Sequence, residues 1–209
     1  MADDDAIATE LLALGSATLG ESGAGRMAPR IKPAWRGARL AARAFPVVCG
    51  PGDNLAIHVA VTESPAGRAL VVDASAVPEL GYWGEVLTTG AEARDLRGLV
   101  IDGGVRDVDA LEQHAFPVFS ALIALPGAKK VAGGSVGGTA GVAGVEVGDG
   151  DWVVGDADGV VVVPRGSVAD VLAAGRARAD KEHTMFDKLR AGETTITLLG
   201  LDPTKVDRG

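Results

Sequence analysis

Short apolar runs alternate with segments of helical spacing along the first part of the chain. Apolar runs of strand length cover 31–35, 39–49, 69–73, 99–102 and 116–119. Helices are indicated over 6–14, 55–61, 85–94 and 107–114. The glycine-rich stretch 15–25 is expected to form a loop. This alternation of strands and helices predicts parallel strands joined by crossover helices.

From residue 133 onward the apolar runs become shorter, and glycine-rich turns separate them. Strands are expected over 142–147, 151–154 and 160–163, with 156–159 as a β-turn. Such close spacing is typical of antiparallel strands. The last long segment, 168–190, is rich in alanine and charged residues and predicts a helix. The whole chain, 1–209, is therefore predicted to be a single α/β domain with a mixed sheet, sheet layers in the middle and helices outside.

Composition narrows the possible functions. The 209 residues include 20 basic and 28 acidic side chains, a formal net charge of −8, so a nucleic-acid partner is not expected. One cysteine excludes an internal disulfide framework and a multi-cysteine zinc site. No apolar run reaches the roughly 18 residues needed to cross a bilayer, and the acidic start of the chain is unlike a secretory signal. We therefore expect a cytoplasmic protein without a membrane partner.

The segment 98–107 is the first candidate for chemistry. An apolar strand leads into Gly103 and Gly104, which are expected to form an open turn, and the turn presents Arg106 and Asp107. Ligands of parallel sheets bind beyond the carboxyl ends of the strands. At this position Asp107 could hold a hard cation, and Arg106 could bind a carboxylate or enolate oxygen. Alternatively, the two residues only cap the helix that follows.

The segment 81–89 is the second candidate. Gly84 opens a predicted helix, and the amides of a first helical turn form a natural anion site. A substrate carboxylate could bind the amides of Val86 and Leu87, with Gly84 leaving room for its approach. Alternatively, Gly84 is a plain turn residue and Glu85 only complements the helix dipole.

Together these segments resemble a known family. Glu85 and Arg106 are separated by 20 residues and Asp107 follows directly, which is similar to the acid-X20-Arg-Asp signature of the RraA-like family. Further blocks of similarity occur in the same order at 51–58, 82–85, 116–119 and 150–164. The resemblance covers about 10–195, with arms on either side. It implies the α/β/β/α sandwich of the RraA-like swivelling-domain type.

The resemblance also implies a metal site for Mg²⁺ or Mn²⁺. Asp107 would be the direct protein ligand, and Glu85 would hold metal-bound waters. Glu182, in the late helix, would reach the metal waters of a neighbouring subunit, so a homotrimer or hexamer is implied. Alternatively, Glu182 belongs to a solvated helix face. Position 85 is Glu where the family's aldolases often have Asp. The segment 121–134 lacks the Arg- and Gly-rich stretch of many members, and Lys129 and Lys130 partly take its place.

The function that the resemblance implies is a divalent-metal-dependent aldolase. It would cleave 4-hydroxy-2-oxo di- or tricarboxylic acids to release pyruvate, and it could decarboxylate oxaloacetate. Arg106 would contact the oxo or enolate oxygen, and the Gly84–Leu87 turn would bind the carboxylate. Because no lysine lies in an apolar strand, the metal route fits better than a Schiff base. The alternative function is a non-catalytic protein inhibitor of a ribonuclease, which other members of the family provide.

Overall fold

The computed structural model of the protein describes residues 2–207. Residues 1 and 208–209, which belong to the predicted 1–209 domain, lie outside the described residues. The helices are α1 (Ala2–Gly20), α2 (Leu55–Glu63), α3 (Glu85–Glu92), α4 (Val108–Gln113), α5 (Val168–Arg190) and α6 (Thr195–Leu199), followed by a 3-10 turn at Pro203–Lys205. The strands are β1 (Gly25–Arg26), β2 (Lys32–Pro33), β3 (Leu40–Cys49), β4 (Arg68–Asp73), β5 (Gly81–Trp83), β6 (Gly98–Val105), β7 (Val118–Ile123), β8 (Gly134–Val136), β9 (Thr139–Val142), β10 (Val145–Gly148), β11 (Trp152–Gly155) and β12 (Val160–Val163).

The main sheet is mixed, as predicted. Its strand order is β1-β12-β11-β3-β4-β6-β7-β2, with β5 paired to β6 and β8 paired to β3. The central strands β3, β4, β6 and β7 run parallel, and β5 joins β6 in the same direction. The flanking pairs are antiparallel, and β9 and β10 form a separate antiparallel hairpin.

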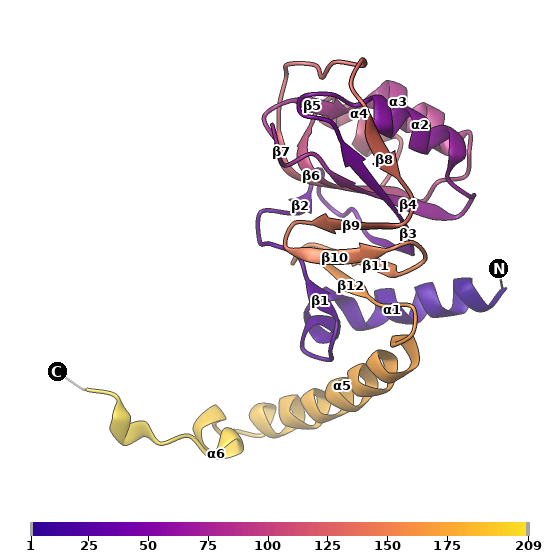
Figure 1. The fold of residues 1–209 in the computed structure, drawn as a ribbon. Helices are drawn as coiled ribbons and strands as arrows, with labels where there is room; N and C mark the ends of the chain where they lie inside the picture. The colour runs from indigo at the N-terminus through magenta and orange to yellow at the C-terminus, as the bar shows by residue number, and fades with distance from the viewer. Residues whose placement is uncertain (1, 208–209) are drawn as a thin grey trace.

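The elements stack in the predicted α/β/β/α order (Figure 1). One apolar cluster lies between α2–α4 and one face of the central parallel strands, with Ile57, Leu99 and Leu111 fully buried. A second joins the other face of these strands to β9–β12. A third packs α1 and α5 against β11 and β12 through Leu11 and Leu172. The fold class predicted from the sequence is confirmed.

The predicted loop at 15–25 is wrong in its first part, because α1 continues to Gly20. Gly15 has non-helical backbone angles (φ 77°, ψ 162°) and kinks the helix. The next turn is capped from a distant part of the chain: Asp156 accepts hydrogen bonds from the backbone N–H of Ser16 at 2.7 Å and from its hydroxyl at 2.5 Å. Leu19, in the continued helix, is fully buried. The burial of Leu19 and the cap at Ser16 stabilise a turn of helix that the glycine-rich sequence disfavours.

The predicted open turn at Gly103 and Gly104 is also wrong, because β6 runs through both glycines to Val105. A Cβ on Gly104 would lie 2.6 Å from the carbonyl oxygen of Leu80, and one on Gly103 would lie 2.8 Å from Ala74. The glycines therefore allow neighbouring chain to approach the sheet closely. The predicted single strand 142–147 is likewise a hairpin, with positive φ at Ala143 and Gly144 between β9 and β10.

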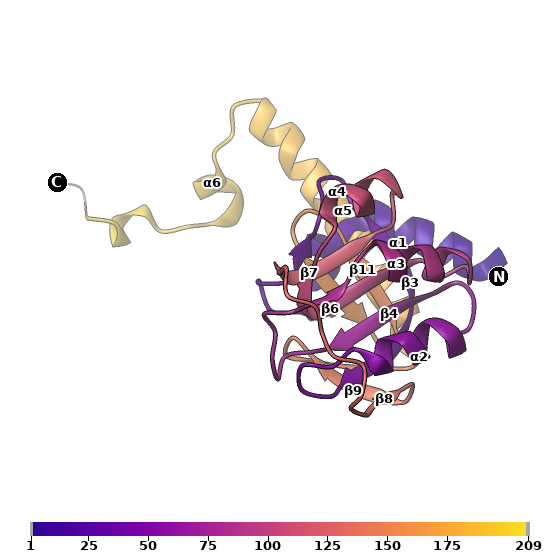
Figure 2. The ribbon, with the colours of Figure 1, turned by 90° about the horizontal axis from the view of Figure 1, so that it is seen from above.

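The last part of the chain extends away from the layered body. In Figures 1 and 2, α5 leaves the sandwich and α6 lies well outside it. This arm exposes large apolar side chains, namely Phe186, Ile196, Leu199, Leu201 and Val206. Within residues 2–207, no helix combines the length and apolar character that a membrane crossing requires.

Candidate active site

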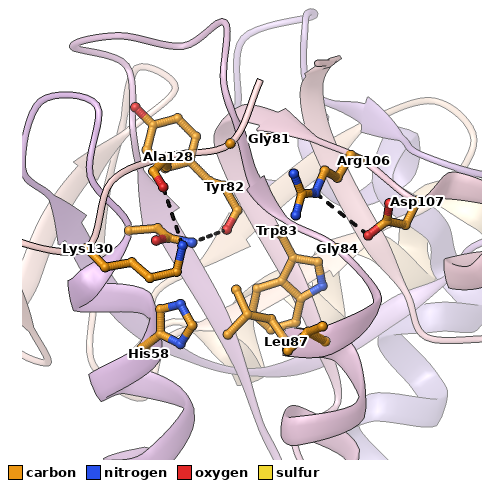
Figure 3. A pocket seen from close by; sticks show the side chains of 13 residues that line it. His58, Gly81, Tyr82, Trp83, Gly84, Leu87, Arg106, Asp107, Ala128 and Lys130 are labelled. Carbon is orange, nitrogen blue, oxygen red and sulfur yellow. Dashed lines mark hydrogen bonds and ion pairs between the residues drawn. The ribbon is translucent and has the colours of Figure 1, made fainter. Parts of the chain in front are cut away.

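A pocket of about 170 Å³ opens where four parts of the fold meet. These parts are the turn from β5 into α3, the junction of β6 and α4, the start of α2 and the loop at 127–130 (Figure 3). The pocket lies beyond the carboxyl ends of parallel strands β5 and β6, which is the usual place for ligands in such sheets. It is lined by Asn54, His58, Gly81, Tyr82, Trp83, Gly84, Val86, Leu87, Arg106, Asp107, Gly127, Ala128 and Lys130.

Asp107 combines an uncommon backbone conformation with a side chain that does not cap its own helix. It stands at the N-cap position of α4, but its side chain makes no capping hydrogen bond. Instead, Oδ2 accepts a hydrogen bond from the backbone N–H of Glu85 at 3.1 Å. Its backbone is left-handed (φ 57°, ψ 40°), a conformation that is uncommon for residues other than glycine and often found at functional sites. The Asp107 carboxylate therefore does not serve as the cap of α4, which was the alternative interpretation.

Arg106 reaches the same pocket from the end of β6. Its backbone N–H donates to the carbonyl of Trp83 at 2.9 Å, which ties the two pocket segments together. Its Nε lies 3.8 Å from Asp107 Oδ2, and its side chain is 45% exposed. The guanidinium is thus only loosely paired, and its remaining donors are available to a ligand in the pocket. Gly81 leaves room for the Arg106 side chain, because a Cβ at this position would lie 3.1 Å from the Arg106 Cδ.

The first turn of α3 contributes backbone amides. Thr88 N–H donates to the carbonyl of Gly84 at 3.1 Å and forms the first bond of the helix. The amides of Val86 and Leu87 lie before it, where a helix offers no internal acceptor. Both residues line the pocket. At Gly84 a Cβ would lie only 2.3 Å from Asp107 Oδ2, so the absence of a side chain allows the helix start and the carboxylate to meet.

The structure does not bring the other two predicted carboxylates, those of Glu85 and Glu182, into the pocket of the same chain. The Glu85 side chain is 57% exposed and is not part of the lining; its Oε1 lies 3.8 Å from the Nε2 of His114. His114 is held in turn by Glu92 at 2.8 Å. Glu182 forms an ion pair with Arg178 at 2.9 Å on α5, which lies on the opposite side of the sandwich from α3 (Figure 1).

The pocket also contains residues that the sequence pattern did not single out as site residues. Asn54, at the start of α2, is 4% exposed and donates from Nδ2 to the carbonyl of Tyr82 at 2.8 Å. His58 lies one turn later on α2, and Lys130 reaches in from the loop (Figure 3). Burial, followed by the charge of Lys130, holds the pKa of His58 below its usual value, although Asp53 opposes the shift. No sequence motif connects α2 to a loop more than 70 residues later, so only the fold reveals this cluster.

The donor set fits a hard cation better than zinc. Among the described side chains, no group of three or more His, Cys, Asp and Glu residues could hold a metal ion by itself. A cation at Asp107 would therefore have one protein carboxylate, with water and substrate oxygens as its other ligands. Mg²⁺ is commonly held in this way, by one or two carboxylates together with substrate. The Asp107 side chain is 43% exposed and lines the pocket, so its carboxylate is open to such a ligand.

Comparison with known proteins identifies the family. The model of the RraA-like family, described as Aldolase/RraA, matches residues 8–162. The chain belongs to this family. A Halalkalibacterium halodurans relative, provisionally named 4-hydroxy-4-methyl-2-oxoglutarate aldolase, is 33% identical over 153 residues, which are 73% of each chain. A Burkholderia mallei protein with the same provisional name is 36% identical over 111 residues, covering 53% of this chain and 67% of that one.

Solved structures of RraA-like proteins share the fold. An uncharacterised protein from Pseudomonas syringae superposes with a TM-score of 0.82 at 28% identity, covering 91% of each chain. The RNA-processing inhibitor RraA from Thermus thermophilis superposes with a TM-score of 0.62 at 27% identity, covering 71% of this chain and 89% of that one. The RraA-like fold is thus found in proteins with an aldolase name and in an inhibitor of RNA processing, so the function must be argued from the site.

Proposed function

We propose that this RraA-like protein is a divalent-metal-dependent aldolase that releases pyruvate from 4-hydroxy-2-oxo di- or tricarboxylic acids. The observation that carries the proposal is that Arg106, Asp107 and the α3 start at Val86 and Leu87 line one pocket. Such a set combines a hard-cation ligand, a guanidinium and an anion site. The provisional aldolase names of two relatives support the same chemistry.

Different residues would bind the substrate and stabilise the negative charge that forms during cleavage. The amides of Val86 and Leu87 would bind the carboxylate of the pyruvate unit. Arg106 would donate hydrogen bonds to the adjacent oxo oxygen, where negative charge develops as the carbon–carbon bond breaks. A preorganised donor of this kind typically contributes about 10²–10³-fold to the rate. The same stabilisation would allow the protein to decarboxylate oxaloacetate.

Asp107 would hold the cation, Mg²⁺ or Mn²⁺, and Glu85 would support its waters. When bound, the cation would supply Lewis acidity toward the oxo acid. The Glu85 carboxylate points toward His114 in the structure, so it would need to rotate or act through water. A water in the pocket would take the proton of the substrate hydroxyl as the carbon–carbon bond breaks, and a proton would then pass to the enolate carbon to give pyruvate. Glu85 or Glu182 would support that water.

Glu182 can take this role only from a neighbouring copy, because α5 lies away from the pocket of its own chain (Figure 1). We therefore propose that the protein forms a homotrimer or hexamer. The extended arm with its exposed apolar side chains, Phe186 and Ile196 among them, supports an assembly in which the arm packs on another copy. Light scattering of the purified protein tests the assembly, and a monomer would contradict it.

A second candidate function is inhibition of a ribonuclease without catalysis. The observation that favours it is the similarity to the Thermus RNA-processing inhibitor. Such a protein would act through its surface and would not need Arg106 and Asp107 to meet in a pocket.

One experiment separates the two functions. Pyruvate release is measured from a panel of 4-hydroxy-2-oxo acids and from oxaloacetate, with Mg²⁺ and with EDTA. The aldolase proposal expects release that EDTA abolishes and added Mg²⁺ restores. No release from any member of the panel, together with inhibition of a ribonuclease by the intact protein, would favour the inhibitor.

A further inference from the structure

The half of the pocket away from Asp107 contains polar groups that have no partner within the described part of the chain. Asn54 Oδ1 and His58 Nε2 are buried and make no hydrogen bond there. A buried polar atom without a partner costs about 1–3 kcal/mol. Both residues line the pocket, so a ligand can supply what the protein does not.

Lys130 adds a positive charge to the same half of the pocket. Within the described part of the chain, its Nζ makes one long hydrogen bond of 3.4 Å, to the carbonyl of Ala128. Among residues 4–207, no carboxylate forms an ion pair with it. The chain as a whole carries a net charge of −8, which repels anions at long range. The Lys130 ammonium group in the pocket is therefore suited to attract an anionic ligand locally.

The loop that carries Lys130 is firmly anchored. On one side, Lys129 N–H donates to the carbonyl of Gly52 and its carbonyl accepts from Asn54 N–H, both at 2.9 Å. On the other side, the buried carboxylate of Asp53 accepts from the backbone N–H groups of Val131 at 2.6 Å and Ala132 at 2.8 Å. Lys130 therefore projects from a fixed position beside His58 (Figure 3).

We propose that Asn54, His58 and Lys130 form a subsite for the part of the substrate remote from the pyruvate unit. Lys130 pairs with a second carboxylate, to which His58 Nε2 donates a hydrogen bond, and Asn54 Oδ1 accepts one from a substrate hydroxyl. The subsite selects dicarboxylic hydroxy-oxo acids over monocarboxylic ones. This assignment rests on the proposed function for the orientation of the substrate, with its pyruvate end at Arg106.

Binding of two ligands of equal chain length tests the subsite without turnover. 2-Oxoglutarate ends in a carboxylate and 2-oxopentanoate ends in a methyl group, and both have the oxo-acid end. Calorimetry in Mg²⁺ should show that the wild-type protein prefers 2-oxoglutarate by about 10- to 100-fold, the range for one charge-assisted hydrogen bond. Lys130→Met should abolish that preference, and Lys130→Arg should keep part of it.

Lys129→Met is the matched control, because it removes the adjacent charge from a side chain that does not line the pocket. It should keep the wild-type preference. A wild-type protein without preference, or a Lys130→Met variant that retains it, would overturn the subsite.

Turnover assays separate the two proposals. If no hydroxy-oxo acid releases pyruvate but Lys130 still controls the preference for 2-oxoglutarate, the aldolase proposal fails and the subsite stands. If pyruvate is released and Lys130→Met cleaves dicarboxylic substrates as well as the wild type, the subsite fails and the aldolase proposal stands.

Discussion

Substitution of Gly84 by alanine tests whether the contact between α3 and Asp107 positions the site. The added Cβ would lie 2.3 Å from Asp107 Oδ2 and 3.2 Å from the Arg106 Cγ. The backbone of Gly84 is extended (φ −168°), so alanine is not excluded by its conformation. The conflict is therefore steric and is confined to the site.

The expected magnitude follows from the distance. Contacts of a Cβ below 3.0 Å essentially never occur, so the carboxylate must move by about 3.0 − 2.3 = 0.7 Å or more. The movement also disrupts the hydrogen bond from Glu85 N–H to Oδ2. A misplacement of about 1 Å can reduce a rate by about 10²-fold, which corresponds to about 2.7 kcal/mol. We expect kcat/KM for pyruvate release to fall by about that factor.

Gly90→Ala is the matched control in the same helix. Its added Cβ would meet only Val61 Cγ1, at an ordinary 3.6 Å, and alanine stabilises a helix interior by about 0.5–1 kcal/mol. It should raise the melting temperature slightly and leave turnover unchanged. Steady-state kinetics and thermal melts of both variants provide the test. A folded Gly84→Ala variant with wild-type kcat/KM would refute the reasoning.

Two further predictions concern groups around the pocket. Both Asp53 oxygens accept backbone amides, and although burial opposes its ionisation, these hydrogen bonds hold its pKa below the usual value. The ionised Asp53 should therefore stabilise the fold above the unfolded pKa of about 3.9, and this stabilisation should be lost as the pH falls through the lowered folded pKa. Asp53→Asn should weaken the fall in the free energy of unfolding at acid pH and speed amide exchange at Val131. An unchanged acid dependence would count against this prediction. Burial, then Asp73 and Asp53, raise the pKa of the Cys49 thiol to about 12, so iodoacetamide should label it at pH 8 only after unfolding, and rapid labelling of the native protein would contradict this.

Local sequence patterns predicted the elements whose burial is periodic or continuous. The apolar run of β4, the strand core of β6 and the long helix α5 all lie where expected. The prediction failed where distant residues decide local structure. Asp156 caps the second part of α1 across 140 residues, and the close approach of Leu80 requires Gly104 inside β6. Neither contact leaves a signal in the local sequence.

In the site, too, residues with a local sequence signal could be predicted and residues placed by distant packing could not. The strand end pointed to Arg106 and Asp107, and the helix start pointed to the Gly84–Leu87 turn, each as a separate candidate. Only the resemblance to the family joined them in one site. In the structure all of them line one pocket, beyond the carboxyl ends of parallel strands. Asn54 and His58 could not be assigned from sequence, since their relation to the pocket depends on how α2 packs. The structure keeps Glu182 away from the pocket of its own chain, so its role stays a prediction about an assembly.

The most direct test of the central claim is pyruvate release from 4-hydroxy-4-methyl-2-oxoglutarate, titrated with Mg²⁺, in the wild-type protein and in Asp107→Ala. We predict that the wild-type rate saturates with Mg²⁺ and that the variant stays at background throughout the titration. Wild-type turnover by a folded Asp107→Ala variant would contradict the account.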